Sequence, residues 1–377
     1  MQRLSLTPRP HWQREADRLG FVYHTPGGQI YWDESACYRF TSREIDTIEA
    51  ATADLQDLCL KAAQHVLDNN RFAEFRIPPA AIPLIRRTWE EEPPSIYGRF
   101  DLSYDGVNPP RLLEYNANTP TALLESSIVQ WYWRREVMPA TDQFNSIHEK
   151  LISQWGDIKP YLKDGRLCFT SMPNDEDAMT ATYLRDTAQQ AGIETASLFV
   201  RDIGWNAARR EFRDLQDNRI HSIFALYPWE WLLADFGDAI LETYGETLWI
   251  EPIWKMLWSN KALLAVLWEL FPNHPNLLEA HLDGPRSLRE YIRKPLLSRE
   301  GENITRHALD GETSTPGTYG DEGFVWQALA PPATFDDKWP IIGSWVITDR
   351  GPAGIGIRES DGPVTGNLSR FVPHYFD

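Results

Sequence analysis

Four polar residues on two neighbouring segments could together bind a divalent cation. Arg99 and Asp101 lie two positions apart in one extended segment, and Glu114 and Asn116 lie two positions apart in the next. Side chains two positions apart in a strand share a face, so paired strands would bring two carboxylates and an amide carbonyl together. Such oxygen ligands suit Mg²⁺, which also keeps waters and substrate phosphates. An exposed hairpin face with a salt bridge explains the pattern equally.

Three basic residues farther along the chain could meet an anion. Lys294 precedes a proline and the polar run 298–303 (SREGEN), whose backbone N–H groups could cover phosphates. This run matches neither the Walker pattern nor the dinucleotide fingerprint. Lys261, near a predicted helix start, is equally explained as a solvated lysine, and Arg358, on a predicted strand, as a partner in a surface ion pair.

The acidic residues and histidines limit the classes of enzyme that the sequence supports. Glu176 and Asp177 stand at a predicted helix start, where favourable interaction with the helix dipole explains them without any further role. The nine histidines form no H-E-x-x-H pattern, and no G-x-S-x-G turn occurs. The sequence therefore gives no support to a zinc enzyme or a serine hydrolase.

The elements that must position these residues follow from periodicity. Residues 41–69 form an amphipathic helix that begins with a capping box between Thr41 and Glu44. Residues 96–106 and 109–121 are two strands joined by a turn at Asp105 and Gly106. We therefore expect the four polar residues on a hairpin.

The remainder of the chain predicts an α/β (α+β) fold. A compact α/β subdomain is expected over residues 155–240. Residues 251–272 are expected to be a strand leading into a helix capped by Ser259, and 298–322 a polar loop. The further predictions are strands at 166–172, 194–200, 220–228, 286–297, 323–329, 340–350 and 354–360, and a helix over 175–192. Since no linker rich in Gly and Ser interrupts it, the chain is treated as one unit, 1–377.

Composition limits the partners. In 377 residues, 54 acidic side chains exceed 37 basic ones, and the net charge of −17 should repel nucleic acid and anionic membranes. The three cysteines have no paired spacing, and no apolar leader or span is evident. A cytoplasmic protein is expected. Its oligomeric state stays open.

Six separated motifs resemble, in order, the glutathionylspermidine synthase family, whose synthetase portion is an ATP-grasp carbon–nitrogen ligase. The motifs are YGRFDLSYDG with LLEYNANTPTALLE, then NDEDAMTATYL, WSNKALLAVLWELFP, KPLLSREGENI, VWQALAP and GIGIRESDGPVTGNLSRFVPH. The resemblance implies an ATP-grasp fold with a preATP-grasp-like subdomain over 155–240, and an ATP-grasp site built from 245–377 with 95–130.

The resemblance also implies a role for each site residue, matched position by position. Asp101, Glu114 and Asn116 would bind Mg²⁺, and Arg99 would lie near the reacting carboxylate. The 298–303 loop would be a lid over the phosphates. The other implied positions are Lys261, Lys294, Gln327, Ala328 and Leu329 toward ATP, Arg358 toward phosphate, and Thr119, Thr121, Glu176 and Asp177 toward the substrates.

The implied activity is ligation of an acid to an amine, with ATP and Mg²⁺, through an acyl phosphate. The bifunctional member of the family carries an amidase domain before its synthetase, and 377 residues leave no room for one. Threonines at 119 and 121 replace serines that contact the thiol peptide in that enzyme. The sequence leaves both substrates open: the acid could be glutathione or another peptide, and the amine could be a polyamine or an amino acid. It also leaves open a nucleotide-binding protein that catalyses no reaction.

Overall fold

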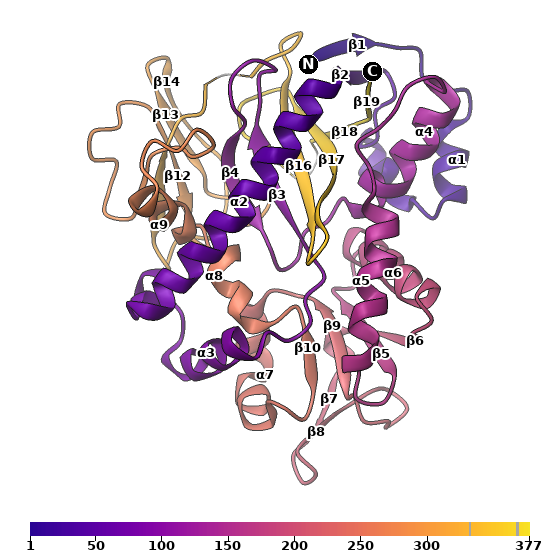
Figure 1. Ribbon diagram of the computed structural model, residues 1–377, viewed down its shortest axis with the longest axis vertical. Helices are drawn as coiled ribbons and strands as arrows, with labels where there is room; N and C mark the ends of the chain where they lie inside the picture. Colours follow the sequence, from indigo (N-terminus) through magenta and orange to yellow (C-terminus); the bar gives the residue numbers. More distant parts are fainter. Residues whose placement is uncertain (332, 367–368) are drawn as a thin grey trace.

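A five-stranded antiparallel sheet lies in the middle of the molecule (Figure 1). This computed structural model describes residues 1–331, 333–366 and 369–377, so Asn367 and Leu368 of the last motif lie outside the described residues. In spatial order, the sheet contains β18 (Arg370–Val372), β17 (Gly351–Ser360), β16 (Trp339–Ile347), β3 (Tyr97–Ser103) and β4 (Arg111–Asn116). The predicted hairpin is therefore confirmed as β3 and β4, which pair in antiparallel register.

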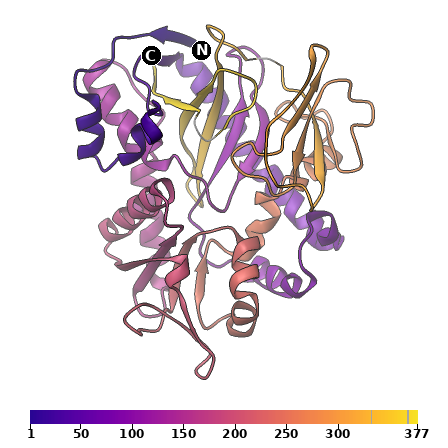
Figure 2. The same cartoon turned by 180° about the vertical axis from the view of Figure 1, so that it is seen from behind.

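A parallel sheet and a second antiparallel sheet adjoin the central one, and Figure 2 shows both from behind. The parallel sheet has the order β10 (Leu248–Ile250), β9 (Ser222–Leu226), β5 (Arg166–Ser171) and β6 (Glu194–Phe199). The second antiparallel sheet has the order β11 (Ala280–His281), β15 (Phe324–Ala328), β12 (Tyr291–Pro295), β13 (Thr305–Ala308) and β14 (Gly311–Ser314). The strands predicted at 166–172, 194–200, 220–228, 286–297 and 323–329 are confirmed as β5, β6, β9, β12 and β15, whereas β10, β11, β13 and β14 were not predicted.

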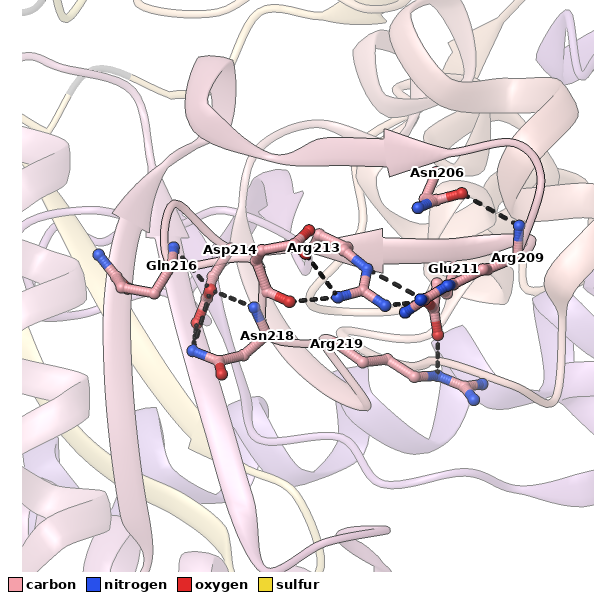
Figure 3. Close-up of polar contacts among 9 residues, drawn as sticks. Asn206, Arg209, Glu211, Arg213, Asp214, Gln216, Asn218 and Arg219 are labelled. Carbon is pink, nitrogen blue, oxygen red and sulfur yellow. Dashed lines mark hydrogen bonds and ion pairs between the residues drawn. The ribbon is translucent and has the colours of Figure 1, made fainter.

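Two small sheets complete the strands. β1 (Gln2–Ser5), β2 (Ala36–Phe40) and β19 (His374–Phe376) join the two ends of the chain, and β7 (Gly204–Asn206) pairs with β8 (Glu211–Arg213). Figure 3 shows polar contacts in and beside this β7–β8 hairpin: Arg213 Nε lies 3.1 Å from Glu211 Oε1, and the backbone N of Asn218 lies 2.9 Å from Asp214 Oδ1.

The helices cover the sheets. They are α1 (Trp12–Arg18), α2 (Ser42–Asp68), α3 (Ile82–Glu91), α4 (Gln130–Val137), α5 (Ile147–Ile158), α6 (Asp175–Gln190), α7 (Trp229–Thr243), α8 (Met256–Ser259) and α9 (Ala262–Leu270). The predicted capping box of α2 is confirmed, since Thr41 and Glu44 exchange both hydrogen bonds. The buried face of α2 packs on the central sheet, where Thr52 Oγ1 lies 2.7 Å from Ser344 Oγ.

Two expectations for the last third were wrong. Ser259 does not cap a helix; it ends α8, and residues 253–259 are helical rather than extended. This run is almost uniformly buried and apolar, so its pattern carries no period that separates helix from strand. The polar stretch 298–322 contains the β13–β14 hairpin, whose second strand is exposed and therefore shows no apolar alternation.

A buried ion pair fixes the start of β3. Lys255 Nζ lies 2.6 Å from Glu251 Oε2, and both side chains are at most 2% exposed. Glu251 also accepts hydrogen bonds from the backbone N–H groups of Ile96 and Tyr97, at 2.9 and 3.2 Å, and from Ser95 Oγ at 2.7 Å. The pair therefore ties the loop after β10 to the strand that carries Arg99.

Glu251→Ala should lower the free energy of unfolding by about 3–5 kcal/mol, because it leaves the buried Lys255 ammonium without its partner. Denaturant unfolding measures the loss. The control is Glu91→Ala, which removes one partner of an exposed pair with Arg87 and should change stability little. Equal losses in the two variants would contradict the account.

Candidate active site

One cleft of about 250 Å³ brings together every residue that was assigned a role singly, together with residues 298–301 of the 298–303 loop. Its floor is the central sheet, and its walls come from the second antiparallel sheet and from the carboxyl end of the parallel sheet. The residues assigned from sequence that line it are Arg99, Asp101, Glu114, Asn116, Thr119, Thr121, Glu176, Asp177, Lys261, Lys294, Gln327, Ala328, Leu329 and Arg358.

Strand register places the polar residues of the floor in two rows. Asp101 stands opposite Glu114 on one side and opposite Gly343 on the other. In the next row, Arg99 stands opposite Asn116 and Trp345. Directly opposed residues share a face of a sheet, so the predicted convergence of these side chains is confirmed.

The two carboxylates of the floor are already hydrogen-bonded within the protein. Arg99 Nε lies 2.7 Å from Asp101 Oδ1, and Asn116 Nδ2 lies 3.1 Å from Asp101 Oδ2 and 3.0 Å from Glu114 Oε1. Burial raises the pKa of Asp101 although Arg99 opposes it. Burial also acts to raise the pKa of Glu114, but Lys261 and Lys294 lower it to about 2. Glu114 is therefore ionised at neutral pH.

Two lysines face these carboxylates from the opposite wall. Lys261 Nζ lies 3.4 Å from Glu114 Oε2 and donates to Ser298 O at 2.6 Å. Lys294 Nζ donates to Gln327 Oε1 at 2.8 Å and to Leu113 O at 2.9 Å. Burial lowers the pKa of Lys294 to about 8. Both lysines line the cleft, so their ammonium groups can bind an anion in it.

The 298–303 loop reaches across the cleft to the hairpin side. Arg299 Nη1 donates to Thr119 Oγ1 at 2.7 Å, and its guanidinium lies 5.8 Å from the centre of the Trp231 ring. Gly301 adopts a φ of +73°, where a side chain would be strained, and an added Cβ would lie 2.5 Å from Thr365 O. The loop is thus seated on the 363–366 segment.

The other end of the cleft is acidic. Glu176 and Asp177 begin α6, at the carboxyl end of β5, where Asn174 Oδ1 accepts from Asp177 N at 2.9 Å. Burial raises the pKa of Asp177, with Arg299 opposing. Arg358 lines the cleft from β17, and its Nη2 donates to Gly366 O while its buried Nε has no partner among the described residues.

The donor set on the floor can hold a hard cation, although its donors presently bond to one another. Among the described residues, no group of three or more His, Cys, Asp or Glu side chains could hold a metal. Asp101 and Glu114 supply carboxylate oxygens, and a half-turn of the Asn116 amide would present its carbonyl in place of its N–H groups. Two carboxylates and one amide carbonyl fit Mg²⁺, which takes few protein ligands.

Several residues that line the cleft were not predicted as site residues from the sequence. Glu230, in the first turn of α7, and Ser259 line the wall beside Lys261, and Trp345 lines the floor. Glu230 follows the strand predicted at 220–228, so the rule that ligands gather at the carboxyl ends of parallel strands could have found it. Trp345 offered no such signal, because an apolar strand residue is expected in the core.

Buried behind the cleft wall is Glu125, also missed. Its side chain is fully buried in a π-helical turn, Glu125–Val129. Burial raises its pKa to about 7, with the nearby Glu176 adding to the effect. The acidic end of the cleft therefore extends below its surface.

In the described part of the chain, none of the helices is long and apolar enough to cross a membrane. The cysteines Cys37, Cys59 and Cys168 are all free and buried.

Comparison with known proteins identifies the family. The family model described as glutathionylspermidine synthase preATP-grasp matches residues 3–377. A Haemophilus influenzae protein, assigned provisionally by its name to the acid–amine ligases, is 40% identical over 100% of both chains. The bifunctional glutathionylspermidine synthetase/amidase of Escherichia coli is 26% identical over 84% of this chain, but the match covers only 56% of that enzyme.

Structural comparison agrees at the level of the fold. A glutathione synthetase-like effector of Globodera pallida superimposes with a TM-score of 0.57 at 10% identity, covering 98% of each chain. The architecture is thus an α/β fold of the ATP-grasp type. Together with the match over 3–377, the 40% identity to a relative of equal extent shows that the chain belongs to the glutathionylspermidine synthase family of amide-bond-forming ligases.

Proposed function

We propose that this protein is an ATP- and Mg²⁺-dependent ligase that joins a carboxylate to an amine through an acyl phosphate. The observation that carries the proposal is the convergence, in one cleft, of paired carboxylates, buried lysines and two arginines drawn from distant segments. The acid is glutathione or another peptide, and the amine is a polyamine.

The chemistry explains why the cleft needs cations. A carboxylate oxygen attacks the γ-phosphorus of ATP, the bond to the bridging oxygen breaks, and ADP leaves. The amine nitrogen then attacks the acyl carbon, phosphate departs with the former carboxylate oxygen, and the nitrogen loses a proton. Because two anions must meet in the first step, Arg99 and Arg358 stabilise the charge that develops there, in a site that is already organised.

ATP would bind against the cleft wall that faces the β3–β4 hairpin. Lys261 and Lys294 contact the phosphates, and the 298–303 loop covers them. The backbone N–H groups of Ala328 and Leu329 already donate to Glu279 O and Glu290 O. The base would lie against the 327–329 edge.

The metal would lie on Asp101, Glu114 and Asn116, whose donor chemistry fits it. Bound Mg²⁺ would neutralise the triphosphate and polarise its phosphoryl oxygens. In the present structure, hydrogen bonds from Arg99 and Asn116 and the ammonium of Lys261 balance the same carboxylates.

The substrates occupy the remaining cleft. Glu176 and Asp177 attract the cationic amine, in keeping with a net charge of −17. Thr119 and Thr121 line the acid side, and Thr119 is held by Arg299. We also propose that 155–240 is the preATP-grasp-like subdomain, that 245–377 with 95–130 forms the ATP-grasp site, and that the protein acts in the cytoplasm.

The test is a substrate screen. The protein is incubated with ATP, Mg²⁺ and mixtures of peptides with polyamines or amino acids, and ADP and amide products are measured by coupled assay and mass spectrometry. ADP formation that requires both an acid and an amine is expected. Tight ATP binding without ADP release in any mixture would favour a non-catalytic nucleotide-binding protein. Amide products formed with amino acids but not with polyamines would show that the amine substrate is an amino acid.

A further inference from the structure

Gly343 lies in the middle of the cleft floor, where its missing side chain leaves room for Arg99. It stands on β16, opposite Asp101 on β3. A Cβ atom at Gly343 would lie 2.8 Å from Cδ and 3.4 Å from Cγ of Arg99. Since non-bonded carbon atoms pack at about 3.5–4.0 Å, an alanine at this position would displace the arginine side chain. Arg99 thus crosses β16 through space that glycine provides.

This crossing determines where the guanidinium lies. Nε and Nη2 of Arg99 donate to the two oxygens of Asp101 at 2.7 and 3.2 Å, and Nη1 donates to Thr121 O at 2.7 Å. The guanidinium carbon also lies 5.6 Å from the centre of the Trp345 ring. A stem pushed away from Gly343 would break this set of contacts, because each depends on the same path across the strand.

We propose that Gly343 is a positioning residue, which acts through Arg99 to set where the carboxylate of the acid substrate lies. The inference rests on the proposed function, which gives that carboxylate to Arg99. The neighbouring Gly356 leaves room for different side chains: an added Cβ there would collide with Ser126 Oγ and the Phe371 ring, and not with Arg99.

Thermal unfolding of a double-mutant cycle tests the contact itself. Gly343→Ala should lower the melting temperature in the wild-type background and leave it nearly unchanged in the Arg99→Ala background, where no Cδ opposes the new methyl group. An equal fall in both backgrounds would overturn the inference, since Gly343 would then act independently of Arg99.

Kinetics test the positioning role. Gly343→Ala should lower kcat for ATP-dependent amide formation about 10²-fold, the effect that a displacement of about 1 Å can have, while KM for ATP stays within twofold. The matched control is Gly204→Ala on β7, where an added Cβ meets nothing closer than Arg213 O at 3.5 Å. An unchanged kcat in Gly343→Ala would overturn the inference. A wild-type protein without turnover would contradict the proposed function and the substrate part of the inference with it, and the thermal cycle would then decide only whether Gly343 positions Arg99.

Discussion

Arg358→Ala should lower kcat for amide formation roughly 10²-fold, about 3 kcal/mol of transition-state stabilisation. Arg358 projects from β17 into the cleft, and its buried Nε has no partner among the described residues. A cation in that position is available to the transferred phosphoryl group, whose charge grows as the bond to ADP breaks. Steady-state kinetics at saturating ATP measures the loss.

The control for Arg358 is a surface arginine. Arg39→Ala removes one partner of an exposed pair with Asp377 and should leave kcat unchanged. Lys294→Ala should resemble Arg358→Ala, because Lys294 is one of the two buried cations of the opposite wall. Fully active Arg358→Ala and Lys294→Ala proteins would remove both residues from phosphate binding.

Glu114→Gln should abolish measurable turnover and lower the melting temperature, with the protein still folded, because the buried Lys261 and Lys294 lose their counter-charge. The change keeps the shape of the side chain and its contact with Asn116, but it removes a charge that is present at every working pH, since the pKa of Glu114 is about 2. Without that charge, Mg²⁺ loses a ligand, and Lys261 and Lys294 lose their counter-charge.

Calorimetric titration with a non-hydrolysable ATP analogue separates these effects. In the wild type, Mg²⁺ should strengthen binding strongly, whereas in Glu114→Gln the strengthening should be much smaller. Glu279→Gln, a matched change outside the cleft, should behave as the wild type. Equal gains from Mg²⁺ in all three proteins would show that the metal does not use Glu114.

Sequence periodicity correctly predicted the helices and strands that have one buried face and one exposed face. The α2 helix was found with its boundaries nearly correct, and the β3–β4 hairpin was found with strands shorter than predicted. The run over 253–259 was misread, because side chains buried on all sides carry no period. The β13–β14 hairpin was missed for the opposite reason, since its outer strand buries nothing.

The candidate site was predictable where strands pair and less so where sheets meet. Local spacing was enough to bring Asp101 and Glu114 together, because strand pairing alone aligns them. The approach of Lys261 and Lys294 to that pair depends on how the sheets pack, and only the resemblance to a family suggested it. Gly343 could not have been singled out, since its importance lies in a distance to Arg99 that no local pattern encodes.

The most direct test of the central claim follows oxygen from the acid substrate to phosphate. The acid that supports turnover in the screen is labelled with ¹⁸O in its carboxylate and incubated with the amine, ATP and Mg²⁺. The account predicts that the released inorganic phosphate carries one ¹⁸O atom for each amide formed, because the carboxylate oxygen attacks the γ-phosphorus and leaves with it. Unlabelled phosphate, or AMP in place of ADP, would contradict an acyl phosphate formed in this cleft.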